Sequence, residues 1–281
     1  MKKYLIPLLA FTMTACQKVS LYDEEMPATK TITFNVNGDF GRPTFTRATL
    51  SADGKDMTDL WIFDYIGDEC VQILHQTSND EDFGEPSMSM TYGQHHLYFV
   101  ASRGSDPDVD DEEHTIVWSI VRDTFWQAAE ITVGNSTATT QEVELIRKVA
   151  KLKVTINDRV PVGCSSLTIT PDSWYYGIDY INGTMTFDDC SPISVTIPNS
   201  YIGTTNLFAS FFTISDASEW TTDVTISSSG SGNSVLGSVS IDDVPLKANR
   251  STNYSGSLFS GQKPFLITLD EEWMDDVVLT W

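Results

Sequence analysis

The stretch that decides the fold is TITFNVNG, residues 31–38, in which apolar and polar side chains alternate. Ile32, Phe34 and Val36 fall on one face of an extended chain, because successive side chains of a β-strand point to opposite sides. The run ends in Asn-Gly, a pair that is typical of turns. The sequence therefore predicts a half-buried β-strand here.

Short runs of the same kind follow along the chain, separated by Gly, Asn, Asp and Ser. Examples are LWIFDY (60–65), HHLYFVAS (95–102), AKLKVTIND (150–158) and CSSLTIT (164–170). Their centres lie about 8–15 residues apart, a spacing that favours antiparallel β-sandwiches. No long amphipathic helix is predicted, although DTFWQAAEITVG (123–134) has room for one short helical turn. The predicted fold class is all-β.

Two domains are expected. A boundary near ELIRKVAKLKV (144–154) gives each half about seven strands, enough to close a sandwich. We therefore place an N-terminal domain at 31–146 and a C-terminal domain at 147–281. The one low-complexity segment, SSSGSGNS (227–234), is predicted to be a flexible hairpin tip.

The N-terminal segment has the features of a secretory signal. Two lysines precede the apolar stretch YLIPLLAFTM (4–13), which is too short to span a bilayer as a helix, and MTAC (13–16) follows. This ending resembles the lipobox of bacterial lipoproteins, which implies a signal peptide at 1–15 and acylation of Cys16. Acyl chains would then hold the protein on the outer membrane. An ordinary signal cleaved nearby is the alternative. Residues 16–30 are polar and aperiodic, and we interpret them as a tether.

The charge of the chain limits its partners. The formal net charge is −22, and removal of residues 1–15 leaves 15 basic and 39 acidic residues, or −24. Such a surface repels phosphate backbones, so a nucleic-acid partner is not expected.

Three cysteines remain in the mature chain: Cys70, Cys164 and Cys190. An odd number permits at most one disulfide within the chain, and we predict Cys164–Cys190. So few cysteines do not make a disulfide scaffold, and the core is expected to come from apolar burial.

No metal or cofactor is predicted. The acidic run DPDVDDEEH (106–114) has Asp111 where an EF-hand loop needs glycine and Val117 where it needs a bidentate acid. A weak calcium site in the loop at 106–113 stays open beside a solvated loop. His95 and His96 are adjacent and point to opposite faces of a strand, so they cannot bind one ion together.

The sequence shows no motif of an enzyme, since G-x-S-x-G, a P-loop and G-x-G-x-x-G are all missing. We therefore predict no catalytic residue. Trp174, Tyr175 and Tyr176 form a candidate platform for stacking on sugars. Because consecutive side chains alternate between faces, at least one of the three is expected in the core.

Several stretches taken in order resemble the fimbrillin-like lipoproteins of Bacteroidales, which are subunits of type V pili and related adhesins. The resemblance rests on the lipobox and on these stretches: TITFNV (31–36), TFTRATL (44–50), DLWIFDYIGDE (59–69), YGQHHLYFVASRG (92–104), RKVAKLKVTI (147–156), VPLKANRSTNYSGSLF (244–259) and FLITLDEEWMDD (265–276). It implies two tandem transthyretin-like antiparallel β-sandwich domains, a location on the cell surface, and other pilus subunits as partners.

The resemblance also implies two ways of maturing. Shaft subunits of the family are cut after an arginine, and Arg47–Ala48 matches that site. Cleavage would release the strand at 31–38, and a strand from a neighbouring subunit would fill the groove by β-strand addition. Anchor subunits keep both strand and lipid. DVVLTW (276–281) would be the donor strand of a shaft subunit, and in an anchor it would fold back on its own domain.

The resulting hypothesis is a non-enzymatic, lipid-anchored fimbrial anchor or accessory subunit that acts in pilus assembly and cell adhesion. We favour the anchor type because the chain is short for a shaft subunit and DLWIFDYIGDE is closer to that type. The alternatives are a shaft or tip pilin matured after Arg47, a surface lipoprotein that binds glycans, and a secreted hydrolase with converging carboxylates.

Overall fold

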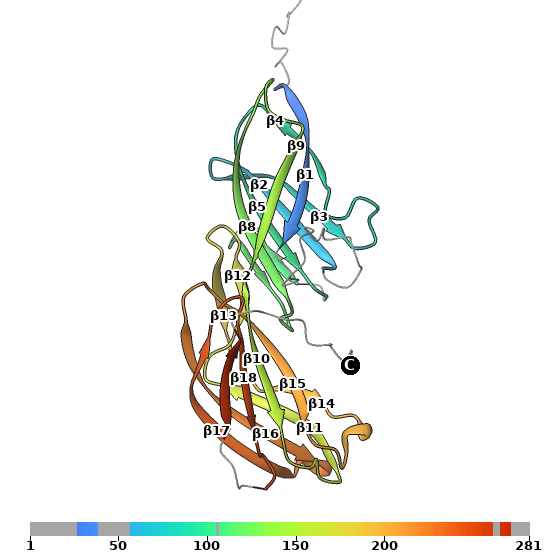
Figure 1. Cartoon of the computed structure of the whole chain (residues 1–281). Coiled ribbons are helices and arrows are strands. Elements are labelled where there is room, and N and C mark those ends of the chain that lie inside the picture. The colour runs from blue at the N-terminus through green and yellow to red at the C-terminus, as the bar shows by residue number, and fades with distance from the viewer. Residues whose placement is uncertain (1–26, 39–56, 105–106, 261–264, 271–281) are drawn as a thin grey trace, which may run out of the picture.

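The computed structural model describes residues 27–38, 57–104, 107–260 and 265–270. The described chain is all-β, as predicted, apart from two single 3₁₀ turns (Figure 1). The elements in order are β1 (Thr29–Gly38), β2 (Asp59–Ile66), β3 (Glu69–Thr77), β4 (Ser87–Thr91), β5 (Gly93–Ser102), β6 (Asp108–Asp110), β7 (Thr115–Val117), β8 (Thr124–Val133), β9 (Thr140–Arg147), β10 (Val149–Ile156), β11 (Cys164–Pro171), β12 (Tyr175–Asp179), β13 (Thr184–Asp188), β14 (Ile193–Thr196), η1 (Asn199–Tyr201), β15 (Leu207–Ile214), β16 (Trp220–Gly230), η2 (Ser231–Asn233), β17 (Val235–Leu246), β18 (Ser251–Gly256) and β19 (Leu266–Asp270).

The N-terminal half is built from a seven-stranded sheet in the order β3-β2-β5-β8-β9-β1-β4. Strands β8 and β9 pair at only two positions, Phe125 with Arg147 and Trp126 with Ile146. The sheet therefore folds over at β9 and packs on itself. The core between its two layers is made of Ile32, Phe34, Val36, Met57, Leu60, Ile62, Phe83, Met88, Met90, Leu97, Phe99, Ala101, Phe125, Val133, Val143 and Leu145.

The C-terminal half is a sandwich of two four-stranded sheets, β15-β10-β18-β19 and β14-β11-β16-β17. Leu152 and Val154 of β10 pack toward Leu167 and Ile169 of β11 in its buried core. Alternate residues of these strands are buried, which is the period-two pattern of a strand with one face in the core.

A third sheet, which we call the bridging sheet, lies between the two halves of the sequence, in the order β13-β12-β7-β6. Strands β6 and β7 come before the predicted boundary at 146/147, whereas β12 and β13 come after it. The two parts join where β7 and β12 pair, with Ile178 opposite Ile116. This sheet packs on the outer face of β2 and β5, where Phe63, Val100, Ile178 and Tyr180 belong to one buried cluster, the junction cluster.

Two details differ from the sequence prediction. The strand pairs β1–β9 and β10–β18 are parallel, although an antiparallel arrangement was expected. Both pairs join segments far apart in the sequence, as parallel pairing requires. Residues 124–133, where a helical turn had room, form the regular strand β8.

Candidate assembly site

The predicted lipidation and cleavage residues, Cys16, Arg47 and Ala48, lie outside the described residues. The strand predicted between them is described as β1. It begins at Thr29, inside the last two residues of the predicted tether, and ends at Gly38.

β1 occupies the middle of its layer. It pairs in parallel with β9, from Thr33 opposite Thr140 to Gly38 opposite Leu145. Along its other edge it pairs antiparallel with β4, from Thr29 opposite Thr91. Removal of β1 would therefore leave two unpaired sheet edges facing each other across one empty strand position.

The inward side chains of β1 fill the core of this half. Ile32, Phe34 and Val36 are at most 1% exposed. The Phe34 ring lies edge-on to Phe99 of β5, with 5.5 Å between centroids. Full burial of such side chains contributes about 1.5–3 kcal/mol each. The three together contribute about as much as the whole free energy of unfolding of an ordinary domain.

Polar contacts fix β1 at both ends. The Lys30 ammonium donates to the backbone carbonyls of Gly134 at 3.3 Å and Asn135 at 3.1 Å. Near the other end, Asn35 donates to the Glu142 carboxylate of β9 at 2.8 Å. These contacts set the register of the strand as well as its place in the sheet.

The junction between the halves holds a buried ion pair that the sequence did not single out. The Arg147 guanidinium donates to both carboxylate oxygens of Asp123, at 2.7 and 2.9 Å, and to Asn249 of the C-terminal half at 2.9 Å. Its side chain is 1% exposed. The signal available in the sequence was a pair of basic residues inside an apolar run, RKVA (147–150).

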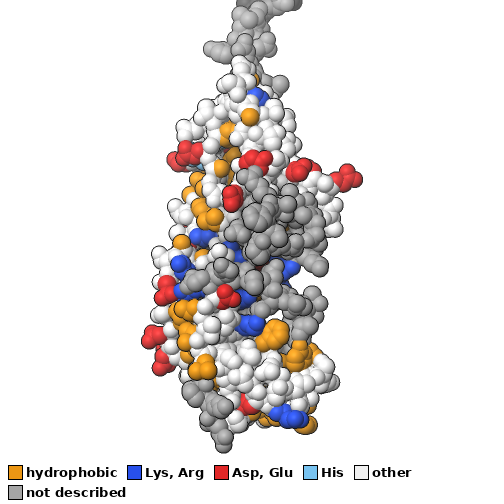
Figure 2. All heavy atoms as spheres, viewed as in Figure 1, with side chains coloured by type: hydrophobic (Ala, Val, Ile, Leu, Met, Phe, Trp, Pro, Cys, Tyr) orange, Lys and Arg blue, Asp and Glu red, His pale blue; other side chains and the backbone are white. Residues whose placement is uncertain are grey.

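Lys148 is the single residue between β9 and β10. Its ammonium lies 3.1 Å from Asp216, and its backbone amide donates to the Thr124 carbonyl. On the face drawn in Figure 2, Lys and Arg side chains gather mainly near the middle of the molecule. The halves are thus joined by paired charges without a linker.

Aromatic side chains make a second set of contacts across the junction. The rings of Phe63 and Tyr180 stack at 3.9 Å, and the Trp126 indole donates to the Tyr180 carbonyl at 2.7 Å. The hydroxyls of Tyr65 and Tyr180 lie 3.0 Å apart, and Tyr65 also reaches His114 Nδ1 at 3.1 Å. Burial raises the pKa of the Tyr180 hydroxyl, so it stays protonated.

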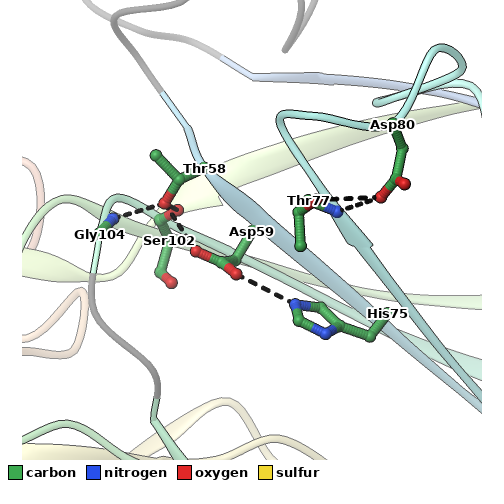
Figure 3. A network of polar contacts seen from close by, with 7 residues as sticks. All are labelled: Thr58, Asp59, His75, Thr77, Asp80, Ser102 and Gly104. Atoms are coloured by element: carbon green, nitrogen blue, oxygen red, sulfur yellow. Dashed lines mark hydrogen bonds and ion pairs between the residues drawn. The ribbon is translucent and has the colours of Figure 1, made fainter.

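A polar network at the start of β2 contains a histidine, a carboxylate and hydroxyls, which are residue types of hydrolytic active sites (Figure 3). The Thr58 hydroxyl donates to one Asp59 oxygen at 2.6 Å, and His75 Nε2 lies 3.0 Å from the other. The imidazole stacks on Trp61 at 4.2 Å. These contacts orient His75 against the sheet.

The network lacks the geometry of a nucleophile and its base. The Thr58 hydroxyl donates its hydrogen bond to the Asp59 carboxylate and not to a base, and the nearby Ser102 hydroxyl is buried with no hydrogen-bond partner. Within the described ranges, no hydroxyl is bonded to the His75 imidazole, so the arrangement provides no activated serine.

A second histidine–carboxylate pair is buried inside the N-terminal half. His95 Nε2 donates to the Thr91 carbonyl at 2.9 Å, and its Nδ1 lies 2.7 Å from Asp64. Burial raises the pKa of the Asp64 carboxyl, while its contact with His95 acts in the opposite direction. His96 points to the other face, 3.4 Å from Glu130, as the alternation predicted.

The aromatic platform is not formed as a solvent-facing surface. Trp174 is fully buried and its indole donates to the Phe212 carbonyl at 2.9 Å. Tyr175 and Tyr176 are half-buried against the junction cluster. Burial raises the pKa of Tyr176 to about 12. Because this segment enters the bridging sheet, its aromatic side chains serve as packing.

The predicted Cys164–Cys190 disulfide is absent. Both residues, like Cys70, are free thiols. Cys164 is buried in the sandwich with its Sγ 3.0 Å from the Ser228 hydroxyl, whereas Cys190 is exposed after β13. The predicted disulfide was therefore wrong. It rested on the number of cysteines, whereas Cys164 lies in the core and Cys190 on the surface.

Residues 108–117, which include most of the acidic segment, form the β6–β7 hairpin. Asp110 accepts hydrogen bonds from the backbone amides of Glu112 and Glu113, at 3.0 and 2.9 Å. Across the part of the chain that the structure describes, no group of three or more His, Cys, Asp or Glu side chains is arranged to hold a metal ion. Asp110 instead caps its own turn.

Comparison with solved structures defines the class of fold. A proposed adhesin from Bacteroides thetaiotaomicron has a TM-score of 0.55 at 8% identity, over 89% of this chain and 98% of that one. A proposed adhesin from Bacteroides ovatus gives 0.55 at 12%, over 90% and 95%. The fimbrial anchor protein Mfa2 from Porphyromonas gingivalis gives 0.52 at 9%, over 88% and 98%. The chain has the fold of these surface proteins, in agreement with the fimbrillin-like resemblance.

A family model also matches the chain. The model for DUF6562, a family of unknown function, matches residues 108–280, and the chain belongs to that family. The match begins at the first residue of β6, so it includes the whole bridging sheet. The search of curated proteins finds no match. In the described ranges, no helix is long and apolar enough to cross a membrane.

Proposed function

We propose that the protein is a non-enzymatic, lipid-anchored subunit of a type V pilus, of the anchor or accessory type, acting in pilus assembly and cell adhesion. Acylated Cys16 holds it on the outer membrane. Other pilus subunits are its partners, through β-strand addition. Residues 31–146 and 147–281 are its two proposed domains, after the signal peptide at 1–15 and the tether at 16–30.

The burial of β1 is the observation that carries this proposal. The strand is paired on both edges and supplies Ile32, Phe34 and Val36 to the core. A strand so bound is suited to connect a folded body to a lipid at Cys16. The resemblance in fold to a fimbrial anchor protein supports the same assignment.

The second candidate is a shaft or tip pilin. Arg47 follows β1 and precedes β2, so cleavage there cuts the covalent link between the strand and the rest of the sheet. Loss of β1 then opens a groove that accepts a strand from a neighbouring subunit. The burial of β1 is equally compatible with this candidate, because removal of a deeply buried strand leaves an apolar groove, so the state of the N-terminus decides between the two.

Mass spectrometry of the N-terminus of protein recovered from intact cells distinguishes the two. We expect acylated Cys16 followed by an uncut chain through Arg47. A start at Ala48 replaces the anchor assignment with the pilin. An unmodified start elsewhere overturns both. A Cys16→Ala variant, which has no acylation site, gives the matched control for the lipid.

A further inference from the structure

One sheet of the C-terminal half has a basic outward face, although the chain as a whole is acidic. Figure 1 draws its strands β10, β15 and β18 in the lower half of the molecule, and β19 completes the sheet. On β10, Leu152 and Val154 enter the core, so Lys151 and Lys153 point outward. The other outward positions of the four strands carry one charge, on Asp270. We define the lysine face by six residues: Lys151, Lys153, Phe208, Phe212, Ser251 and Asp270.

The first lysine of this face is buried although it lies on the outward side. Lys151 is 3% exposed, and so is Ser251, its neighbour on β18. Lys153 is partly buried, with its ammonium 5.0 Å from the centre of the Phe208 ring. A lysine is almost never buried unless its ammonium is paired, because the charged group otherwise loses its hydration. The lysine face is therefore suited to bind acidic side chains.

The chain leaves β19 beside this face. Asp270 ends the strand and lies opposite Ser251, so it shares a row of the sheet with Lys151. The acidic segment EEWMD (271–275) follows; it lies outside the described residues and carries three acids. Two strand spacings of about 4.8 Å separate Asp270 from Lys151, and an extended chain covers about 3.3–3.6 Å per residue. About three residues are thus enough to cross from β19 to β10.

The order of residues in the acidic segment matches the order of the strands that it would cross. After β19 the face presents Ser251, then the two lysines of β10, and then Phe208 and Phe212 of β15. The segment presents two glutamates and then Trp273 and Met274. Carboxylates pair with ammonium groups, and indole and thioether side chains pack favourably on aromatic rings. Each part of the segment therefore meets a surface of matching chemistry.

A segment of the same chain has an advantage over a separate acidic partner. Its attachment at Asp270 gives it an effective concentration at the lysine face on the order of millimolar. A separate acidic molecule would have to approach a protein with a net charge of −22, which repels it. The tethered segment pays neither cost, so it is the occupant that the charges favour.

We infer that the acidic segment, residues 271–275, binds across the lysine face of its own domain, with Glu271 and Glu272 paired to Lys151 and Lys153. The inference does not rest on the pilus role. It concerns the residues that precede DVVLTW (276–281) and names the side chains that receive them. With the segment bound, residues 276–281 start next to β15 instead of leaving the domain directly from β19.

Cross-linking with a carbodiimide tests the pairing in the full-length protein, because this reagent joins an amine to a carboxylate only where the two are in contact. We expect peptide mass spectrometry of the monomer to find a lysine of the face joined to a glutamate of the segment. The double variant Lys151→Met/Lys153→Met keeps long, unbranched side chains and removes both ammonium groups. Lys247→Met, at a partly buried lysine outside the face, is the matched control.

A glutamate-specific protease measures how closely the segment is held, since it cuts after Glu271 and Glu272. The double variant should lose its C-terminal residues about tenfold faster than the wild type, a difference that two partly buried ion pairs supply. The Lys247 control should be cut as the wild type is. Circular dichroism checks the fold, and if the double variant does not fold, Lys153→Met alone should be cut about threefold faster.

Two results overturn the inference: equal cleavage rates in the folded lysine variant and the wild type, or no such cross-link in the monomer. A cross-link found only in dimers also overturns it, because the face would then bind the acidic segment of a second copy.

Discussion

Replacement of Phe34 by alanine tests how firmly β1 is held. Phe34 is 1% exposed, and its ring packs edge-on to Phe99 at 5.5 Å between centroids. Truncation of a buried phenylalanine to alanine costs about 3–5 kcal/mol, because the side chain leaves a cavity as well as losing burial. We expect Phe34→Ala to lower the free energy of unfolding by about 4 kcal/mol. For a protein of this size that is a fall of roughly 8–16 °C in Tm.

Urea titration and calorimetry measure this loss. Phe187→Ala is the control, because Phe187 of β13 is 57% exposed and its truncation should change the free energy of unfolding by less than about 0.5 kcal/mol. Equal losses in the two variants would refute the reasoning, since β1 would then contribute no more to the fold than a surface residue. The anchor assignment would lose its structural support with it.

Three further outcomes follow from particular contacts. Arg147→Met leaves the Asp123 carboxylate buried without its bidentate partner and should cost about 3–5 kcal/mol in urea unfolding, most of it recovered when Asp123 is also made Leu. Burial alone would raise the pKa of Asp158, but backbone amides of residues 258–260 lower it below its ordinary 3.8. Its contribution to stability is therefore complete above that value and lost as pH falls through the lower, folded-state pKa. Titration of the unfolding free energy against pH should show Asp158→Asn without that loss. A thiol reagent should label Cys190 quickly in the native protein and Cys164 only after unfolding. If neither thiol reacts without a reductant, the Cys164–Cys190 disulfide is present after all.

The prediction of strands rested mostly on the local alternation of apolar and polar residues. TITFNVNG became β1 with its three apolar residues inward, and AKLKVTIND and CSSLTIT became β10 and β11 with alternate residues buried. These segments have one face in a core, so period-two alternation is visible in the sequence itself. The parallel pairs were missed because strand order and direction depend on which distant segments meet, and periodicity carries no information on that.

The junction was missed for the same physical reason. Strands β6 and β7 are only three residues long, and β12, the partner of β7, lies about 60 residues further along the chain. No pattern within a short stretch of sequence predicts such a pairing. Tyr175 and Tyr176 show the consequence, since a run of aromatic residues looks the same in the sequence whether protein or water covers it. The free thiols show it again, because a count of cysteines says nothing of the distance between them.

The junction also limits how far the two halves of the protein can move against each other. One residue, Lys148, separates β9 from β10, and the bridging sheet joins strands from both sides of it. Rotation of one half against the other would have to break the Arg147 contact to Asn249, and would expose Phe63 and Tyr180. Inter-domain motion is the default where interfaces are small and polar, and this one is buried and largely aromatic. A pull on the N-terminal half therefore passes to the C-terminal half through paired charges and packed rings, which is what the proposed anchor role would require.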